Sequence, residues 1–196
     1  MAKHTPGFIK IVDDGSMSLF VGLPDMGQSS HTAMAMIAAE VLGAKPTDIT
    51  VISGDTDIVP LDVGALIQRG TFNTGNAVKA AALDARKQLE VLAAGRLGVK
   101  PAQLVFRDRQ VYPKGQPEKA IPLKKIVYDT LHSREGRFVM GRGFYNSPKE
   151  SGTMAYSFGA QIAEVTIDPD TGFVTVDRIV ASHDVGRAIN PRIVEG

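Results

Sequence analysis

Apolar and polar residues alternate near both ends of the chain, and this pattern predicts a β-hairpin at each end. Near the N-terminus, residues 8–12 and 17–23 flank an Asp-Asp-Gly-Ser turn. Near the C-terminus, residues 155–167 and 173–182 are longer apolar-rich segments on either side of an Asp-Pro-Asp-Thr-Gly turn. Four strands are therefore expected in two pairs that are far apart in the sequence.

Three segments between these hairpins have the composition or spacing of helices. Residues 31–42 are apolar nearly all round, so we expect a helix that is buried on most sides and ends at Gly43. Residues 78–97 place apolar side chains three and four positions apart, with charged residues between them, which is typical of a long amphipathic helix. Residues 123–131 predict a third, shorter helix after a proline.

The remaining segments complete a mixed architecture. A strand is predicted at residues 49–52 and a small hairpin at residues 105–112, whereas residues 134–151 are polar and rich in glycine, which predicts a long loop. The order of elements predicts an α+β fold, with mixed or antiparallel sheets packed with helices. A subdivision of the chain, if present, is expected at this loop, between residues 1–133 and 134–196.

Composition narrows the class of protein. The 196 residues suffice for one large domain or two small ones, and a net charge of +1 gives no indication of a nucleic-acid partner. No apolar run approaches the roughly 18 residues of a membrane span, and the N-terminus lacks the apolar core of a signal peptide. We therefore expect a cytoplasmic protein without a membrane or nucleic-acid partner.

Metal ligands held directly by side chains are not indicated. The chain contains no cysteine, which excludes disulfides and thiolate ligands from its own residues. Its four histidines lack metal-ligand spacing, and Asp55 and Asp57 have no third carboxylate nearby. These two aspartates are predicted to stabilise a loop.

The loop at residues 22–30 leads directly into the first predicted helix. Ser29 or Ser30 is placed to cap that helix, and the adjacent glycines leave backbone N–H groups accessible to an anion. The Gln28 amide adds a further donor. The alternative interpretation is an ordinary capped helix that follows a strand and binds nothing.

The loop at residues 64–76 has the same relation to the long amphipathic helix. Arg69 is suited to a bidentate contact with phosphate, and Thr71, Thr74 and Asn76 offer hydroxyl and amide groups. The alternative is an ordinary loop in which Asn76 caps the helix. Two such loops in one chain favour a single extended anionic ligand, because helix N-termini bind phosphate without a cationic surface.

The C-terminal segment contains a His-Asp pair that invites a catalytic interpretation. Adjacent strand residues point to opposite faces, so His183 and Asp184 are not expected to form a dyad. We instead expect a tight turn in which Asp184 and Asn190 cap backbone groups and Gly186 has a positive φ. A new helix is expected to begin after Asn190.

Several strings together resemble the molybdenum-cofactor-binding subunit of the xanthine dehydrogenase/aldehyde oxidase family, the molybdenum hydroxylases. They occur in the family's order and span most of the chain. The GDTD string and the Arg-x-Thr-Phe pattern are similar to the 4-hydroxybenzoyl-CoA reductase and carbon monoxide dehydrogenase-like subgroups. The matching segments are residues 26–43, 51–64, 69–81, 155–174 and 183–191.

This resemblance implies a molybdenum ion held by the dithiolene of a pterin, usually extended as a cytosine dinucleotide in bacteria. The chain would be part of the second molybdenum domain of an oxidoreductase, with electrons passing through FAD and 2Fe–2S clusters on partner subunits or domains. The reaction implied is hydroxylation of a carbon centre or its reductive counterpart. The implied cofactor-binding residues are Met26, Gly27, Gln28, Ser29, Arg69, Gly70, Thr71 and Thr74.

The departures from the family pattern bear on activity. Ser29 stands where the family usually has the last glycine of Gly-Gln-Gly. The first molybdenum domain and the glutamate that acts as general base are not in the chain, so no catalytic residue is assigned. We expect a cofactor-binding fragment over residues 1–196 that is inactive alone and self-associates through its uncovered face. The alternatives are a stand-alone pterin- or nucleotide-binding module and a subunit-contact domain without a ligand.

Overall fold

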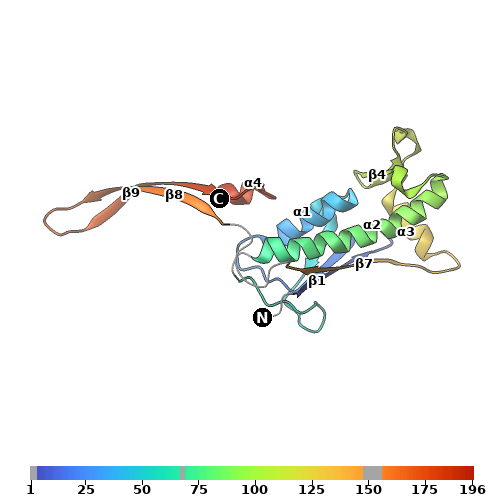
Figure 1. The fold of residues 1–196 in the computed structure, drawn as a ribbon, viewed down its shortest axis with the longest axis horizontal. Helices are drawn as coiled ribbons and strands as arrows, with labels where there is room; N and C mark the ends of the chain where they lie inside the picture. Colours follow the sequence, from blue (N-terminus) through green and yellow to red (C-terminus); the bar gives the residue numbers. More distant parts are fainter. Residues whose placement is uncertain (1–3, 67–68, 148–155) are drawn as a thin grey trace. The chain divides into compact units, whose positions relative to one another are not determined.

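The computed structural model describes residues 4–66, 69–147 and 156–196. The chain divides into two compact units, one formed by residues 1–150 with 189–196 and the other by residues 151–188. Figure 1 shows the elements of each unit along the chain. The predicted α+β class is confirmed, because helices pack on a mixed sheet in the first unit.

A four-stranded sheet with the order β3-β2-β1-β7 forms the base of the first unit. The predicted N-terminal hairpin is formed by β1 (His4–Ile11) and β2 (Met17–Val21), which pair antiparallel. The predicted strand β3 (Ile49–Ile52) runs parallel to β2, and β7 (Val139–Asn146) pairs antiparallel with β1. The sheet is therefore mixed.

Two helices pack on this sheet and against each other. Helix α1 (Ser30–Leu42) ends at Gly43, as predicted, with φ of 63°. Helix α2 (Gly75–Leu97) begins beside the first half of α1, where Gly75 faces Met34. Farther along, the Arg86 guanidinium donates to the carbonyl oxygen of Val41, 2.8 Å away. The two helices therefore run in the same direction, and their N-termini lie at the same end.

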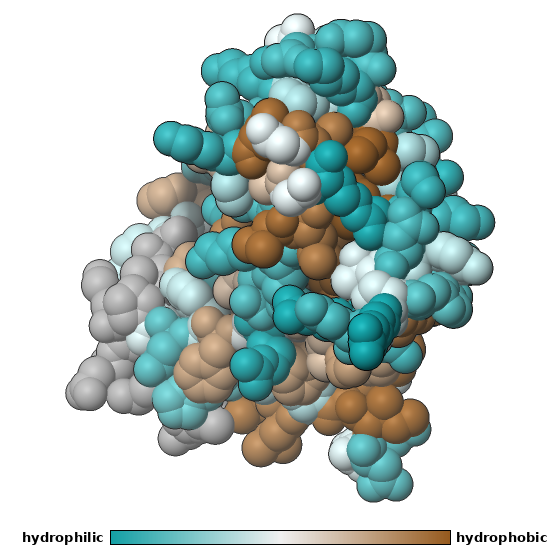
Figure 2. Space-filling view, turned by 90° about the vertical axis from the view of Figure 1, so that its right-hand side faces the viewer, coloured by the Kyte–Doolittle hydropathy of each residue, from teal (hydrophilic) through white to brown (hydrophobic). Residues whose placement is uncertain are grey.

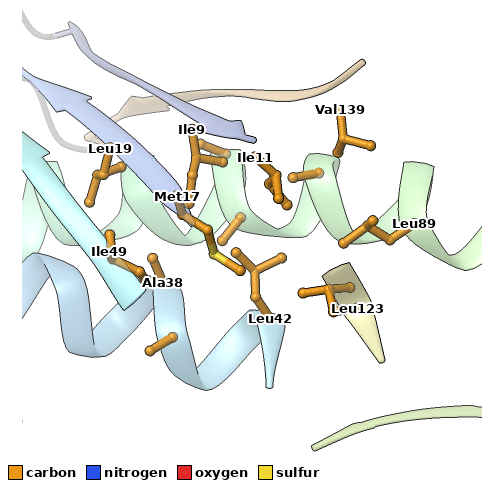
Figure 3. Close-up of a cluster of buried hydrophobic side chains, with 14 of the residues drawn as sticks. Ile9, Ile11, Met17, Leu19, Ala38, Leu42, Ile49, Leu89, Leu123 and Val139 are labelled. Carbon is orange, nitrogen blue, oxygen red and sulfur yellow. The ribbon is translucent and has the colours of Figure 1, made fainter. Parts of the chain in front are cut away.

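The core lies between the sheet and these helices (Figure 3). It also includes α3 (Leu123–Leu131), which spans the predicted residues and buries its N-terminal leucine. Large side chains from the sheet meet small ones on the helices, so the helices approach the strands closely. The labelled core residues are Ile9, Ile11, Met17, Leu19, Ala38, Leu42, Ile49, Leu89, Leu123 and Val139.

The prediction of a loop over residues 134–151 holds for residues 134–138 but was wrong for its centre, which forms the edge strand β7; residues 148–151 lie outside the described part of the chain. A Cβ atom at Gly141 or Gly143 would overlap the backbone carbonyl oxygen of Ala81 or Ala77 in α2. The helix therefore lies directly on the strand backbone, and the inward positions carry glycine instead of bulky apolar residues. This substitution removes the hydrophobic alternation from which a strand is normally predicted.

A smaller sheet with the order β4-β5-β6 completes the first unit. The predicted hairpin is formed by β4 (Leu104–Arg107) and β5 (Gln110–Pro113), and β6 (Ile121–Pro122) pairs with β5. Short helical turns η1 (Pro46–Asp48), η3 (Pro101–Gln103) and η4 (Pro117–Lys119) connect the elements. Figure 2 views the molecule from the side on which β4 and α3 lie, where apolar patches alternate with hydrophilic residues.

The second unit is the predicted C-terminal hairpin of β8 (Phe158–Ile167) and β9 (Val174–Asp184). Paired residues share a face, and successive residues alternate between faces. One face carries the Glu164–Arg178 ion pair and the hydrogen bond from Thr166 to Asp177. The opposite face also carries Gln161, opposite Ala181. Its apolar residues, here called the apolar hairpin face, are Ala163, Val165, Ile167, Val174, Val176, Ile179 and Ala181.

The end of this hairpin differs in part from the prediction. His183 and Asp184 are the last residues of β9 and not part of the turn. The Asp184 carboxylate accepts the backbone N–H of Gly186, whose φ is 61°, as expected. The predicted helix start is confirmed by α4 (Pro191–Glu195), but the Asn190 side chain makes no capping bond to it.

Candidate cofactor-binding site

The structure brings together the two loops that the sequence singled out. They precede α1 and the start of α2, which are neighbouring helices running in the same direction. Gly70, at the start of the second loop's helical turn, faces the side chain of Leu23, at the start of the first loop. The backbone segments 24–30 and 70–74 thus lie at one end of the first unit, although 39 residues lie between them in the sequence.

The first loop is organised by Asp25, not by the predicted serine caps. Ser29 occupies the N-cap position of α1, but its side chain makes no capping bond. The Asp25 carboxylate instead accepts the backbone N–H of His31 at 3.2 Å and that of Gly27 at 2.9 Å. These N–H groups, that of Gly27 first, hold the pKa of Asp25 below its usual value. The N-terminus of α1 therefore already carries an anion from the chain itself.

Gln28 folds back onto its own loop. Its side-chain oxygen accepts the backbone N–H of Met26 at 2.5 Å, and its amide nitrogen donates to the carbonyl oxygen of Pro24 at 3.0 Å. These hydrogen bonds close the loop on itself, and the Met26 side chain is exposed on its outside. Gly27 sits at the tip with φ of 99°, and no atom lies within contact distance of a Cβ there. The tip is open to an approaching ligand.

Ser29 occupies a backbone conformation that favours glycine. Its φ of 56° lies in the left-handed region, which costs a residue with a Cβ roughly 1 kcal/mol. A glycine at this position would meet the requirement without strain. The serine is therefore accommodated at a conformational cost, and the loop keeps the geometry that a glycine would give.

The second loop ends in a π-helical turn, η2 (Gly70–Thr74), that continues directly into α2. Asn76 was one predicted cap of this helix, but it does not cap it. It lies within α2, and its amide donates to the carbonyl oxygen of Phe72 at 2.6 Å. The turn has no acidic residue and no capping side chain. The exposed part of the turn therefore presents no negative charge of its own.

Arg69 is engaged by groups of the chain itself. Its guanidinium donates to the carboxylate of Asp62, to the carbonyl oxygen of Gly64 at 2.8 Å and to the hydroxyl of Thr5 at 2.7 Å. Thr74 is also buried, and its hydroxyl donates to Asp62 at 3.4 Å. Of the predicted residues in this loop, Thr71 is exposed, Gly70 and Arg69 are partly buried, and Thr74 is buried.

The segment that follows β3 lies next to the first loop. The Ser53 hydroxyl lies 2.7 Å from Nε2 of His31, which ties this segment to α1. Asp55 accepts the backbone N–H of Asp57, which confirms the predicted loop-stabilising role of Asp55. A pocket of about 170 Å³ opens here, lined by Gly22, Gly54, Thr56, Val59, Pro60, Leu61 and Asp62. Within the described part of the chain, no three potential metal-ligating side chains gather.

Sequence reasoning missed the three polar residues that organise the site: Asp25, Asp62 and Thr5. Asp25 stands five positions before α1, too far for the usual capping pattern. Asp62 lies in a segment without periodicity, and Thr5 is an ordinary strand residue. Only the tertiary structure brings Thr5 and Asp62 to Arg69.

The fold and the paired loops define an α+β cofactor-binding domain, and comparison with known proteins gives its family. The profile of the family described as "Molybdopterin cofactor-binding domain" matches residues 1–196, so the chain belongs to this family. The predicted resemblance to molybdenum hydroxylases is thereby confirmed. Among the residues that the structure describes, no helix is long and apolar enough to cross a membrane.

Curated relatives and solved structures agree with this assignment. The carbon monoxide dehydrogenase large chain of Afipia carboxidovorans is 32% identical over 191 residues, covering 96% of this chain and 23% of its own length. The probable hypoxanthine oxidase XdhD of Escherichia coli K12 is 33% identical, covering 96% of this chain and 19% of its own length. A crystal structure of Cu,Mo-CO dehydrogenase superposes with a TM-score of 0.85 at 30% identity, over 100% of this chain and 24% of that chain. The chain thus spans about a quarter or less of these relatives.

Proposed function

We propose that the chain supplies one wall of a molybdopterin site in a molybdenum-dependent oxidoreductase. The observation that carries this proposal is the meeting of loops 24–30 and 70–74 at the N-termini of two neighbouring helices. Backbone N–H groups, hydroxyls and an open glycine tip suit a phosphate-bearing pterin. The lack of cysteine also fits, because the dithiolene of the pterin supplies the sulfur ligands when the cofactor is bound.

The two loops are proposed to contact different parts of the cofactor. Asp25 places a carboxylate at the N-terminus of α1, so a phosphate there would meet like charge. We therefore assign Met26, Gly27, Gln28 and Ser29 to the uncharged pterin rings. The π-helical turn, which has no acidic residue, is assigned to phosphate through Gly70 and Thr71. Arg69 and Thr74 are proposed to contribute indirectly, by holding the turn in the conformation that binds the phosphate.

Catalysis by this chain alone is not proposed. The site residues described here bind and orient, and none is placed to exchange a proton with a substrate. FAD and 2Fe–2S clusters are proposed on partner subunits or domains, as is the general base, and the cofactor is proposed to be the cytosine dinucleotide form. A cytoplasmic location remains a prediction.

The apolar hairpin face is proposed to pack against the remainder of a molybdenum-hydroxylase large chain. Its members are exposed, including Ile179 at 63%, whereas the opposite face combines the Glu164–Arg178 ion pair with the exposed apolar pair Ile162 and Val180. A two-stranded hairpin alone is only marginally stable in water, so this face needs a covering surface. The relatives are at least four times as long as this chain, and their additional length can provide that surface.

Titration of the chain with molybdopterin cytosine dinucleotide tests the cofactor assignment. We expect Met26→Ala and Thr71→Ala each to weaken binding, whereas Val91→Ala, at an exposed position farther along α2, leaves it unchanged. Equal affinity of all four proteins would contradict the assignment of the loops. Tight binding by the wild-type chain favours the alternative of a stand-alone binding module.

Undetectable binding by the wild-type chain would favour an incomplete site. The same variants are then measured after this domain replaces the matching quarter of the carbon monoxide dehydrogenase large chain. Molybdenum and pterin content, determined by mass spectrometry and fluorescence, reports binding directly. Unchanged content in Met26→Ala and Thr71→Ala would overturn the assigned contacts in that setting as well.

A further inference from the structure

A buried ion pair lies directly behind the π-helical turn. The side chain of Asp62 is 1% exposed and that of Arg69 is 12% exposed. Their charged groups are 2.5 Å apart. The two side chains also form hydrogen bonds with three other segments of the chain. These partners are Thr5 in β1, the backbone N–H and carbonyl oxygen of Gly64, and Thr74 at the end of the turn.

Stability alone does not account for such a pair. Removing two charges from water costs about as much free energy as their attraction returns, and well-packed apolar residues often serve equally well. Loss of one partner is different, because it leaves an uncompensated buried charge. The distinctive property of this pair is geometric: it fixes β1, the segment 62–64 and both ends of the turn in one arrangement.

The turn itself requires such support. A π-helical segment is rare, and an α-helix is the ordinary continuation at the start of α2. Arg69 stands immediately before Gly70–Thr74, and Thr74 is its last residue, so both ends of the turn are bonded to Asp62. Release of Asp62 would free both ends at once.

We propose that Asp62 and Arg69 are positioning residues that hold the backbone of residues 70–74 in its π-helical conformation. The pair does not contact the ligand and acts through the turn. The consequence for the cofactor rests on the proposed function, in which Gly70 and Thr71 present their backbone groups to a phosphate. The conformational role of the pair does not depend on any ligand.

Hydrogen–deuterium exchange on the 196-residue chain without ligand tests this role. The variants are Asp62→Asn, Arg69→Lys and the double variant Asp62→Leu/Arg69→Met, which replaces both charges with apolar side chains. The control is Glu90→Gln, which breaks the Arg86–Glu90 ion pair farther along α2. Exchange of residues 70–75 is compared with that of residues 82–94 of the same helix, and thermal midpoints are recorded alongside.

We expect exchange of residues 70–75 to accelerate by about tenfold in the three test variants, with residues 82–94 changing much less. The control should leave residues 70–75 unaffected. The double variant keeps its thermal midpoint near the wild-type value, because no buried charge is left unpaired. Unchanged exchange at 70–75 in the double variant, or uniform acceleration along α2, would overturn the positioning role. The double variant keeps this test valid even where Asp62→Asn fails to fold.

Cofactor content of the same variants, in the large-chain setting described above, separates this inference from the proposed function. Faster exchange at residues 70–75 together with reduced cofactor content supports both. Faster exchange with unchanged cofactor content supports the positioning role and overturns the phosphate contact of the turn. Unchanged exchange with reduced content overturns the positioning role and leaves the proposed function standing.

Discussion

The two units of the chain contain similarly apolar strands, but only the first unit buries them. Ile9 and Leu19, on the inner face of the four-stranded sheet, are inaccessible to solvent beneath α1 and α2. Ile162 and Ile179, in the β8–β9 hairpin, are 68% and 63% exposed. An apolar strand pattern thus predicts the strand and the need for a cover, but the cover itself must come from another part of the molecule.

The contrast also concerns how each unit is stabilised. In the first unit, glycine and alanine let helix backbones lie directly on strands, so many segments share one core. The hairpin has cross-strand pairs, a turn and an ion pair, which are the interactions that two strands can make by themselves. The first unit is therefore expected to fold cooperatively, and the hairpin to acquire its stability from a partner surface.

Truncation of a core side chain gives the largest expected contrast. Leu89→Ala should lower the free energy of unfolding by about 2–5 kcal/mol, because it leaves a cavity beneath α2. Ile179→Ala in the hairpin should change it by no more than about 0.5 kcal/mol, as for exposed positions generally. Urea denaturation followed by circular dichroism measures both. A loss of similar size for Ile179→Ala would mean that the hairpin is covered in the isolated chain.

The glycines of β7 offer a second test of close packing in the first unit. Gly143→Ala should cost about 1–3 kcal/mol or more, because the added methyl group meets the backbone of α2. Gly95→Ala, at an open position within α2, should instead stabilise the chain by about 0.5–1 kcal/mol. The same denaturation experiment compares the two. A neutral Gly143→Ala would show that helix and strand are less closely packed than the structure indicates.

These glycines also show where prediction from sequence ends. The predicted bounds of α3 and β3 match the structure, and those of α1 do so to within one residue, because periodicity and flanking glycine or proline mark them locally. Strand β7 was missed because its inward positions are Gly141 and Gly143, whose role is apparent only once α2 lies against them.

The candidate site was predictable to the same degree. Its two loops were identified from glycine and polar residues before helices, but the partner of Arg69 was not. Whether Arg69 meets a phosphate or a buried carboxylate depends on a tertiary contact with Asp62. A sequence pattern records which groups are available, whereas the fold decides which of them remain free.

Self-association of the isolated chain tests whether the apolar hairpin face is uncovered. The expected change in free energy is smaller than for the core and glycine variants. The isolated chain is expected to associate through the apolar hairpin face, and Val176→Glu should weaken this association by about tenfold, because a charge would be buried without a partner. Thr175→Glu places the same charge on the opposite face and should have little effect. Sedimentation at several concentrations measures both variants. A monomeric wild-type chain, or equal effects of the two variants, would contradict the expectation.

The smallest expected contrast concerns two aspartates, one in each unit, whose pKa values are lowered by similar bonds. The backbone N–H of Gly27, followed by that of His31, lowers the pKa of Asp25, and the Thr171 hydroxyl, followed by the N–H of Asp170, lowers that of Asp168. A lowered pKa in the folded state means that each carboxylate stabilises its structure above its ordinary pKa of 3.8. This contribution is lost as the pH falls through the lower, folded value.

The two units should nevertheless respond differently to loss of these bonds. Asp25→Asn is expected to lower the thermal midpoint of the cooperative transition slightly at pH 7, because Asp25 caps α1, which is part of the core. The difference from the wild-type chain should disappear at a pH below the folded pKa of Asp25, where both side chains are neutral. Asp168→Asn should leave that midpoint unchanged and alter only the amide resonances of residues 168–173 at the tip of the hairpin. A shift of the midpoint by Asp168→Asn as large as that by Asp25→Asn would show that the hairpin and the helix-covered sheet unfold together, and that the contrast between the two units is one of exposure alone.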